Sequence, residues 1–301
     1  KNIAVSSFLA PYFFKKTDGN ILTTSDNLEE LLANTEIGSD IPLSLLRPPF
    51  SNCYIEFTES RTSNFKLLNE VSGEHILEGA YIRESTLEAG TYTFDPSSLD
   101  QIKLDPNQDL RVIDIMFTGS PIGKEHNLDD ANRIQSFFIQ DKKITIAEEL
   151  EEIQKLFGND SDFTQDQEYI KPALEHLIKV VLFLNCKQYR DTAFDERKEI
   201  LKRIENLKSP SKISKISKKL RKTYDRVIIK PLDNKKYEQT NIASEHYQER
   251  EKSAHWRKGF LRMQAYGEKL SLRKLLFIEP TIVGGVFARK KDYKGKTKSN
   301  N

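Results

Sequence analysis

Apolar and polar residues alternate over short stretches in the first 144 residues of the chain. Cys53, Ile55 and Phe57 alternate with Tyr54, Glu56 and Thr58, which is the two-residue period of a strand with one buried face. Further strand candidates, separated by turn residues such as Asp95-Pro96, are 79–83, 91–94, 110–117 and 134–140. Their irregular spacing predicts an antiparallel meander rather than strands that alternate with helices.

The apolar residues recur at helical intervals from Thr145 onward. Thr145 and Glu148 have the spacing of a capping box, and the periodic run after them ends at Gly158. A second helix, around residues 170–184, is apolar on most sides, so we expect it to be buried. We interpret His176, on this helix, as a surface or satisfied core residue rather than as a ligand.

Other helical patterns are shorter or more polar. Residues 27–33 predict a short helix capped by Ser25 or Asp26, and residues 191–207 predict a charged amphipathic helix. The Ser/Lys segment at 209–222 contains no acidic residue. It is either a basic linker or a helix that forms on an anionic partner.

The carboxy-terminal part combines strand patterns with aromatic and basic residues. Residues 224–229 predict one strand, and residues 255–285 predict two strands joined by a turn at Gly267. The apolar residues that would cover a core there are Leu275, Phe277, Pro280, Ile282 and Val283. The last residues, 291–301, are mostly polar, and we expect a disordered tail.

These elements predict an α+β fold, with an antiparallel sheet, packed central helices and a basic C-terminal β extension. The expected portions are an acidic, mostly β portion at 1–144, a helical portion with the basic Lys/Ser segment at 145–222, a basic β portion at 223–290 and the tail at 291–301. If the last strands join the first sheet, the chain is one compact domain.

The composition favours a globular chain in a reducing compartment. Charged residues make up 31% of the chain, and the mean hydropathy is −0.60. The apolar run around 174–184 is shorter than the roughly 20 residues that span a bilayer, and residues 1–14 lack a signal-peptide cleavage pattern. Cys53 and Cys186 lie outside any CxxC pattern, so we expect free thiols in a bacterial cytoplasm, without zinc or another cofactor.

The net charge of +2 conceals a segregation of charge along the chain. Residues 1–189 contain 17 Lys and Arg against 31 Asp and Glu, whereas residues 190–301 contain 30 against 14. An acidic front and a basic back suggest two surfaces with different partners, the basic one suited to phosphate backbones. Charge alone leaves RNA, DNA, the ribosome and a merely solvated face open.

The only Trp of the protein lies among basic and aromatic residues, a mixture that suits unpaired RNA because bases stack on such side chains. The candidate RNA or ribosome contacts are His255, Trp256, Arg257, Lys258, Arg262, Tyr266, Arg273 and Lys274, together with Lys212, Lys215, Lys218, Lys219, Arg221 and Lys222 of the Ser/Lys segment. We expect these groups to form one outward platform.

The run His255-x-Arg257-Lys258-Gly259, the turn ending near Tyr266-Gly267 and the basic and apolar strand through Pro280 resemble the carboxy-terminal signature of type V-A anti-CRISPR proteins of phages and mobile elements. The resemblance is specific over about 30 residues. It implies that the chain recognises the nascent amino-terminal segment of a type V effector nuclease and causes loss of its messenger during translation. It also implies messenger or ribosome contacts at His255, Arg257, Lys258 and Gly259.

Three functions remain open at this point. The leading one is a non-enzymatic inhibitor whose acidic front binds a nascent polypeptide, by strand addition at a sheet edge, while its basic back contacts RNA or the ribosome. The second is a ribonuclease acting directly on messenger RNA, for which His246, His255, Glu249 and Arg257 offer acid, base and cation. The third is a DNA-binding regulator of a mobile element, although no helix-turn-helix, zinc-finger or nucleotide-binding pattern is present.

Overall fold

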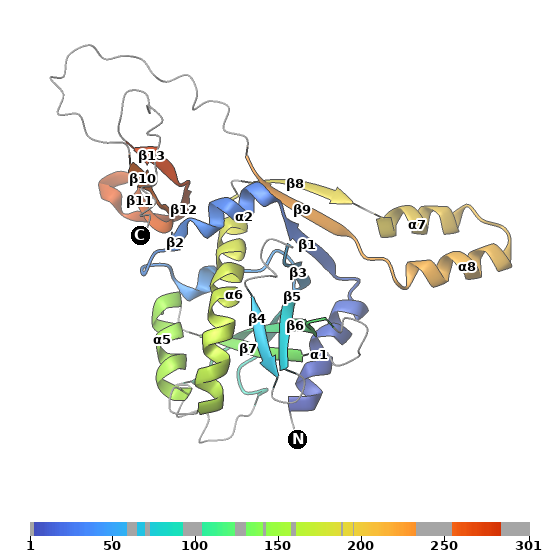
Figure 1. Cartoon of the computed structure of the whole chain (residues 1–301), viewed down its shortest axis with the longest axis horizontal. Helices are drawn as coiled ribbons and strands as arrows, with labels where there is room; N and C mark the ends of the chain where they lie inside the picture. Colours follow the sequence, from blue (N-terminus) through green and yellow to red (C-terminus); the bar gives the residue numbers. More distant parts are fainter. Residues whose placement is uncertain are drawn as a thin grey trace, which may run out of the picture.

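The computed structural model describes residues 3–58, 65–69, 73–92, 104–123, 131–140, 143–157, 161–187, 189–194, 196–232 and 255–283. Within these ranges the chain forms one large sheet with helices on its two faces, a small C-terminal sheet and a projecting pair of helices (Figure 1). This arrangement confirms the predicted α+β fold class.

The large sheet has eight strands in the order β7-β6-β5-β3-β1-β9-β8, with β4 paired to β5. The strands are β1 (Asn20–Thr24), β3 (Asn52–Glu56), β4 (Lys66–Asn69), β5 (Gly73–Leu87), β6 (Leu110–Pro121), β7 (Ala131–Ile139), β8 (Tyr189–Phe194) and β9 (Arg226–Pro231). The pairs from β7 to β3 are antiparallel as expected, whereas β1 lies parallel to both β3 and β9. One sheet therefore joins strands from the front and from the last third of the chain.

Alternation along the central strands assigns one face of this sheet to the core. Ile55 of β3 and Ile82 of β5 lie in one buried cluster with Leu177 of α6 (Ser161–Asn185), which is buried as expected. The helices α2 (Asp26–Ala33) and α5 (Ile146–Phe157) contribute to the same cluster. The alternate residues face α1 (Ile3–Lys16), where the rings of Phe14 and Tyr81 lie 5.3 Å apart.

The local signals for two helix starts are confirmed. The backbone N–H of Leu28 donates to Ser25 Oγ at 3.4 Å, so Ser25 caps α2. In the capping box of α5, Glu148 N–H donates to Thr145 Oγ1 at 3.2 Å, and Thr145 N–H donates to Glu148 Oε2 at 2.8 Å.

Two expectations along the chain are wrong. Residues 191–194, the start of the expected helix at 191–207, belong to β8, and α7 covers only Glu196–Glu205. The ladder with β9 satisfies the backbone of β8, and this tertiary pairing overrides the local helical pattern. In the expected strand at 91–94, Thr91 lies in a bend and Tyr92 in irregular structure, where its Oη donates to the Asp105 carbonyl at 2.9 Å; residues 93 and 94 lie outside the described ranges.

Most of the Ser/Lys segment is helical. Its residues form α8 (Pro210–Leu220), which packs against α7. Together α7 and α8 make a helical hairpin that projects away from the sheet beyond the ends of β8 and β9 (Figure 1). Of the two expected forms of this segment, the structure shows the helix.

The C-terminal sheet has the strand order β12-β11-β2. Its strands are β2 (Thr35–Ile37), β11 (Gly259–Tyr266) and β12 (Leu272–Ile278), and the short helix η2 (Glu268–Leu270) lies between the last two. Next to it in the sequence, β10 (His255–Arg257) pairs with β13 (Thr281–Val283). Another short helix, η1 (Leu43–Leu45), precedes β3. The turn expected at Gly267 is confirmed, and its φ of 79° suits a residue without a Cβ.

Apolar packing attaches this small sheet to the main core. Phe277 is buried, and its ring meets that of Phe183 on α6 edge-on at 5.0 Å. Pro280 is also buried and Leu275 packs against the core, as expected, whereas the side chains of Ile282 and Val283 and the expected tail at 291–301 lie outside what the structure describes. The small sheet is thus anchored by hydrophobic burial.

Candidate nucleic-acid and peptide interfaces

The outer face of the β11–β12 hairpin carries part of the predicted RNA surface. Residues opposite each other in an antiparallel pair share a face, and Gln264 lies opposite Lys274. Arg262 and Tyr266, two residues before and after Gln264, therefore lie on that same face. The Lys274 ammonium lies 5.4 Å from the centre of the Tyr266 ring, which is 42% exposed. We call Arg262, Tyr266 and Lys274 the sheet patch.

Other predicted residues of this region are arranged differently. Arg273 is exposed, but it lies opposite Ala265 and so belongs to the face that carries Leu275 and Phe277. Lys258 forms an ion pair with Glu36 at 2.5 Å, and this carboxylate raises the pKa of the Lys258 ammonium by a hydrogen bond and by its charge. An acidic neighbour therefore partly neutralises Lys258 within the protein.

The motif around the single Trp is described only in its backbone. His255 and Trp256 pair with Val283 and Ile282 in the β10–β13 ladder, and their side chains lie outside the described part of the structure. Arg257 is exposed in the same strand, and Gly259 begins β11. A Cβ at Gly259 would lie 2.8 Å from the Ile278 carbonyl oxygen. Close packing of the strands therefore requires a glycine at this position.

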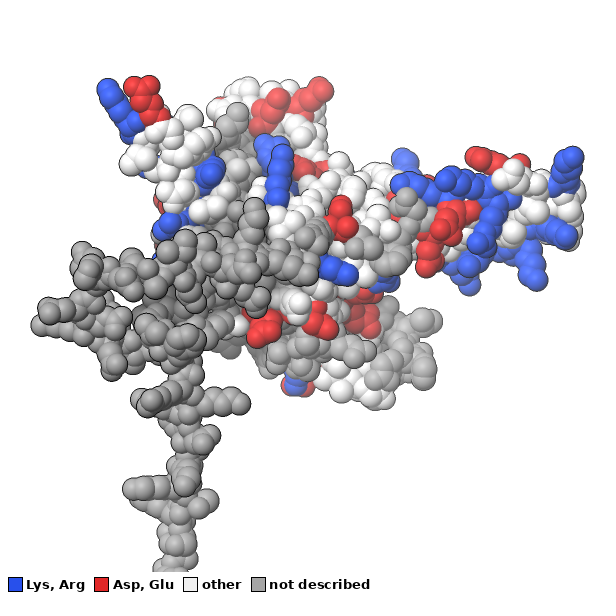
Figure 2. Space-filling view, turned by 90° about the horizontal axis from the view of Figure 1, so that it is seen from above, with Lys and Arg blue, Asp and Glu red and all other residues white. Residues whose placement is uncertain are grey.

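The α7–α8 hairpin carries the remaining predicted contacts. Apolar residues Ile213, Ile216 and Leu220 are half-buried at helical spacing, while the cations of α8 point outward. The exposed cations are Lys212, Lys215, Lys218, Lys219, Arg221 and Lys222. Figure 2 shows basic side chains over the projecting hairpin, with few acidic ones among them. We call these six residues the hairpin patch.

The expected single platform is therefore wrong in its geometry. The small C-terminal sheet and the α7–α8 hairpin lie at opposite ends of the molecule (Figure 1). The reason is topological, because β9 enters the large sheet beside β1 after α8, and the chain returns to β11 beside β2. The predicted cations form two surfaces rather than one.

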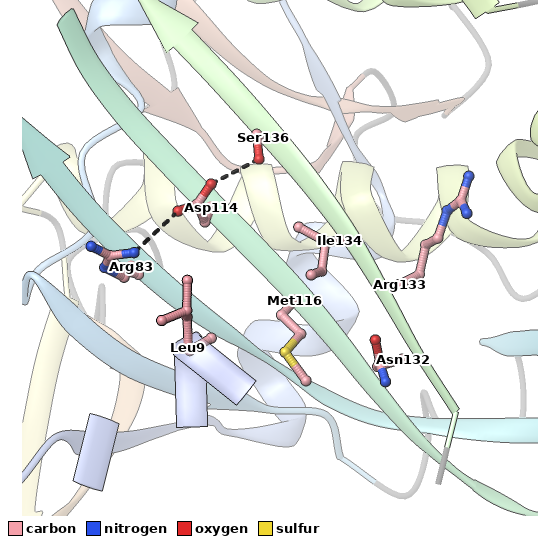
Figure 3. A pocket seen from close by; sticks show the side chains of 9 residues that line it. Leu9, Arg83, Asp114, Met116, Asn132, Arg133, Ile134 and Ser136 are labelled. Carbon is pink, nitrogen blue, oxygen red and sulfur yellow. Dashed lines mark hydrogen bonds and ion pairs between the residues drawn. The ribbon is translucent and has the colours of Figure 1, made fainter. Parts of the chain in front are cut away.

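A groove lies between α1 and the face of β5, β6 and β7 that is turned away from the main core (Figure 3). Its volume is about 500 Å³, with Leu9 of α1 and Met116 and Ile134 of the sheet among its apolar lining. Across its floor Ser136 Oγ donates to Asp114 at 2.7 Å, and Arg83 lies 3.8 Å from the same carboxylate. The groove can take apolar groups beside a fixed set of hydrogen-bonding groups.

The rim of the groove includes strand β7, which lies at an edge of the large sheet. Among the described strands β7 pairs only with β6, so its outer backbone groups face away from the ladder. Phe8 and Tyr12, near the groove residues Leu9 and Ala10 in the sequence of α1, are 74% and 56% accessible. An edge next to an apolar groove is the geometry that an extended peptide uses for strand addition.

Sequence patterns did not single out the groove residues. The usable signal was the alternation in β5 and β6, which places Arg83 and Asp114 on the face opposite the core residues Ile82 and Ile113. Which helix would border that polar face depends on the docking of α1, which no local pattern specifies.

His176 is a buried and partnered core residue, as predicted. Its Nε2 lies 3.4 Å from Glu29 Oε1, and this carboxylate also accepts a hydrogen bond from Thr24. The rings of Phe57 and Phe65 pack around the imidazole at 5.8 and 5.5 Å. Glu29, buried to 3% exposure, was not anticipated from the sequence.

The groups proposed for RNA cleavage are not assembled in the described structure. His246 and Glu249 lie outside the described ranges, as does the side chain of His255. Within those ranges no three His, Cys, Asp or Glu residues gather as a metal site, and no helix has the length and hydropathy to cross a membrane. Burial raises the pKa of the Cys53 and Cys186 thiols to about 12, and both are free.

Comparison with known proteins gives one match. The sequence model of the AcrVA2-like family, described as the anti-CRISPR type V subtype A2 family, matches residues 22–285. No curated protein and no solved structure matches the chain. The matched range extends from β1 to the residues just beyond β13 and so includes both basic surfaces.

Proposed function

Since the chain belongs to the AcrVA2-like family of type V-A anti-CRISPR proteins, we propose that it recognises a nascent type V effector polypeptide and lowers the level of its messenger. In this proposal the protein acts in the cytoplasm of a bacterium infected by a phage or carrying a mobile element. It binds the polypeptide with one surface and RNA or the ribosome with another, and it is not itself a nuclease.

The groove beside β7 supports the peptide half of the proposal. An extended segment adding to the β7 edge would place alternate side chains toward Met116 and Ile134. The Arg83, Asp114 and Ser136 side chains on the floor would offer hydrogen bonds to polar groups of the same segment. The excess of acidic residues in 1–189 favours encounter with a basic peptide.

The two cationic surfaces support the RNA half. The sheet patch offers a guanidinium, an ammonium and an aromatic ring, and the hairpin patch offers a row of ammonium groups. Such groups bind phosphates by releasing counterions, largely without regard to sequence. Selection of one messenger would then come from the peptide that emerges during its translation.

The observation that carries this proposal is the separation of the groove from the cations. The groove lies on β5, β6 and β7, whereas the cationic surfaces lie on other elements, so one molecule can contact a peptide and RNA together. Once the peptide is bound, the RNA attached to the same ribosome is held close to the protein, which raises its effective concentration at the second surface.

A cell-free translation reaction tests the proposal. With the wild-type protein we expect the effector messenger to fall only when it is translated, and a start-codon variant of the messenger to persist. Ile134→Arg fills the groove from β7 and should abolish the effect, whereas Ile122→Arg, at a residue 44% exposed outside the groove lining, should not. Equal loss of translated and untranslated messengers contradicts the proposal.

The same reagents separate binding from cleavage. Purified protein incubated with labelled messenger, without ribosomes and with or without EDTA, should retain the RNA without shortening it. Fragments in this reaction that disappear with His255→Ala would replace the proposal with the ribonuclease alternative.

A further inference from the structure

The α7–α8 hairpin and the sheet patch differ in a way that separates their ligands. Residues 196–222 contain eleven Lys and Arg and three Asp and Glu, and they contain no Phe, Tyr, Trp or His. The sheet patch, in contrast, holds a half-exposed Tyr266 ring beside Lys274. Unpaired bases gain affinity by stacking on aromatic rings, and the hairpin offers none.

The lysines of α8 are placed as a stripe. Lys212, Lys215 and Lys219 follow at intervals of three and four residues and are all exposed, so they lie along one side of the helix. No acidic residue occurs between 206 and 224, and none of the described carboxylates forms an ion pair with these lysines. The stripe is therefore a free row of charge.

Over the length of the stripe a double helix presents more phosphates than a single strand does. From Lys212 to Lys219 the helix rises about 10 Å, at 1.5 Å per residue. A double helix presents about one phosphate per 1.7 Å of axis, or about six over that length, and a single strand presents fewer. With charge as its main attraction, the hairpin favours the duplex.

Hydroxyl groups next to the stripe favour RNA over DNA. Ser211 and Ser214 are exposed and alternate with the lysines along α8. Serine hydroxyls can both donate to and accept from the 2′-OH groups that line the wide, shallow minor groove of A-form RNA. Double-stranded RNA is recognised mainly through those hydroxyls and the phosphates.

One arginine holds the hairpin in place. Arg197 Nη2 lies 2.6 Å from Asp18, and its Nη1 donates to the carbonyls of Leu220 and Thr223 at 3.0 and 3.3 Å. Its backbone N–H donates to Asp225 Oδ1 at 3.0 Å. The start of α7 and the end of α8 are thus fastened to each other and to the turn before β1, which keeps the stripe directed outward.

We propose that the α7–α8 hairpin is a double-stranded RNA-binding arm that contacts phosphates and 2′-hydroxyls without reading bases. This inference rests on the RNA contact in the proposed function and assigns it to a structured RNA. The sheet patch then serves unpaired RNA, so that the two surfaces engage different parts of a folded RNA.

The test measures binding of full-length protein to a 20-base-pair RNA duplex, the same DNA duplex and a 20-nucleotide unpaired RNA. Lys212→Glu/Lys215→Glu/Lys219→Glu should weaken binding of the RNA duplex on the order of 100-fold and reduce its salt slope by about three. Binding of the unpaired RNA should change by less than about threefold, because it uses the sheet patch. Lys15→Glu/Lys171→Glu/Lys230→Glu, the same charge change at exposed lysines elsewhere, should leave duplex affinity within about threefold.

Circular dichroism and thermal melting establish that each variant is folded. Lys→Gln variants at the same positions remove the positive charge without adding a carboxylate, so they show whether loss of the lysines alone weakens binding. An equal loss in the control set, unchanged duplex binding in the hairpin set, or DNA duplex bound as tightly as RNA duplex would overturn the inference. If the wild-type protein binds unpaired RNA but not the RNA duplex, the double-stranded RNA-binding arm is refuted and the proposed function stands. If it binds neither RNA nor ribosomes, the proposed function is refuted as well.

Discussion

The two basic surfaces are built on different physical supports. The C-terminal sheet is held by buried apolar residues such as Leu261 and Phe277, which belong to the main core. The α7–α8 hairpin has Ile200 as its buried residue, and its attachment depends on the charged and polar bonds of Arg197. Hydrophobic attachment is spread over many contacts, whereas polar attachment is concentrated in a few groups. The sheet should therefore be rigid with the core, and the hairpin should be separable from it.

The largest effect should follow from removing the apolar support of the sheet. Phe277→Ala leaves a cavity beside Phe183 and should lower the free energy of unfolding by about 3–5 kcal/mol. Urea denaturation measures this loss, and Leu272→Ala, at a residue 52% exposed in the same strand, is the control with little effect. A Phe277→Ala loss below about 1 kcal/mol would show that the small sheet is not part of the core.

The next effect should be confined to the hairpin. Arg197→Leu removes the guanidinium that donates to the Leu220 and Thr223 carbonyls, and although the Leu220 carbonyl keeps the Thr223 N–H as a donor, the change should cost about 1–3 kcal/mol. In hydrogen exchange, amides of residues 198–220 should exchange faster while those of β5 and β6 keep their protection. Arg203→Leu, at an exposed residue of α7, is the matched control. Faster exchange throughout the large sheet would refute the separability of the hairpin.

A smaller effect should appear in RNA binding by the sheet. Tyr266→Ala removes an exposed ring and should weaken binding of unpaired RNA by about 1 kcal/mol, whereas Tyr266→Phe keeps the ring and should bind like the wild type. Fluorescence anisotropy with the unpaired 20-mer measures both. Equal losses for the two variants would mean that the hydroxyl, rather than stacking, is used.

The smallest effect should come from the exposed pair of Lys258 and Glu36. The pKa of Lys258 is raised above its ordinary value of 10.5 in the folded protein, so the stabilisation is complete below pH 10.5 and is lost as the pH rises through the folded value. Glu36→Gln should thus melt slightly below the wild type at pH 8, and the difference should vanish in strongly alkaline buffer. Because both groups are exposed, a large difference at pH 8 would be inconsistent with this geometry.

Local chemistry made much of this fold predictable. The two-residue alternation at Cys53, Ile55 and Phe57, the caps at Ser25 and Thr145, and the turn at Gly267 all act within a few residues, so the sequence displays them directly. The buried role of α6 followed from its apolar surface on most sides.

The remaining features depend on pairing between distant segments. Residues 189–194 become a strand because β9 lies beside them, and the parallel contact of β1 with β9 brings together residues more than 200 positions apart. The predicted cations were identified by type, but their division into two surfaces is a result of topology. The groove could not be found locally, since α1 and β7 form it from opposite ends of the front portion.

The fastening at Arg197 also bears on how this family can diversify. With Arg197, Asp18 and Asp225 retained, a descendant could exchange the two helices for a sequence of another charge or length while the strands on either side keep their register. The hairpin would then be the part of the molecule that can change while the large sheet keeps its fold.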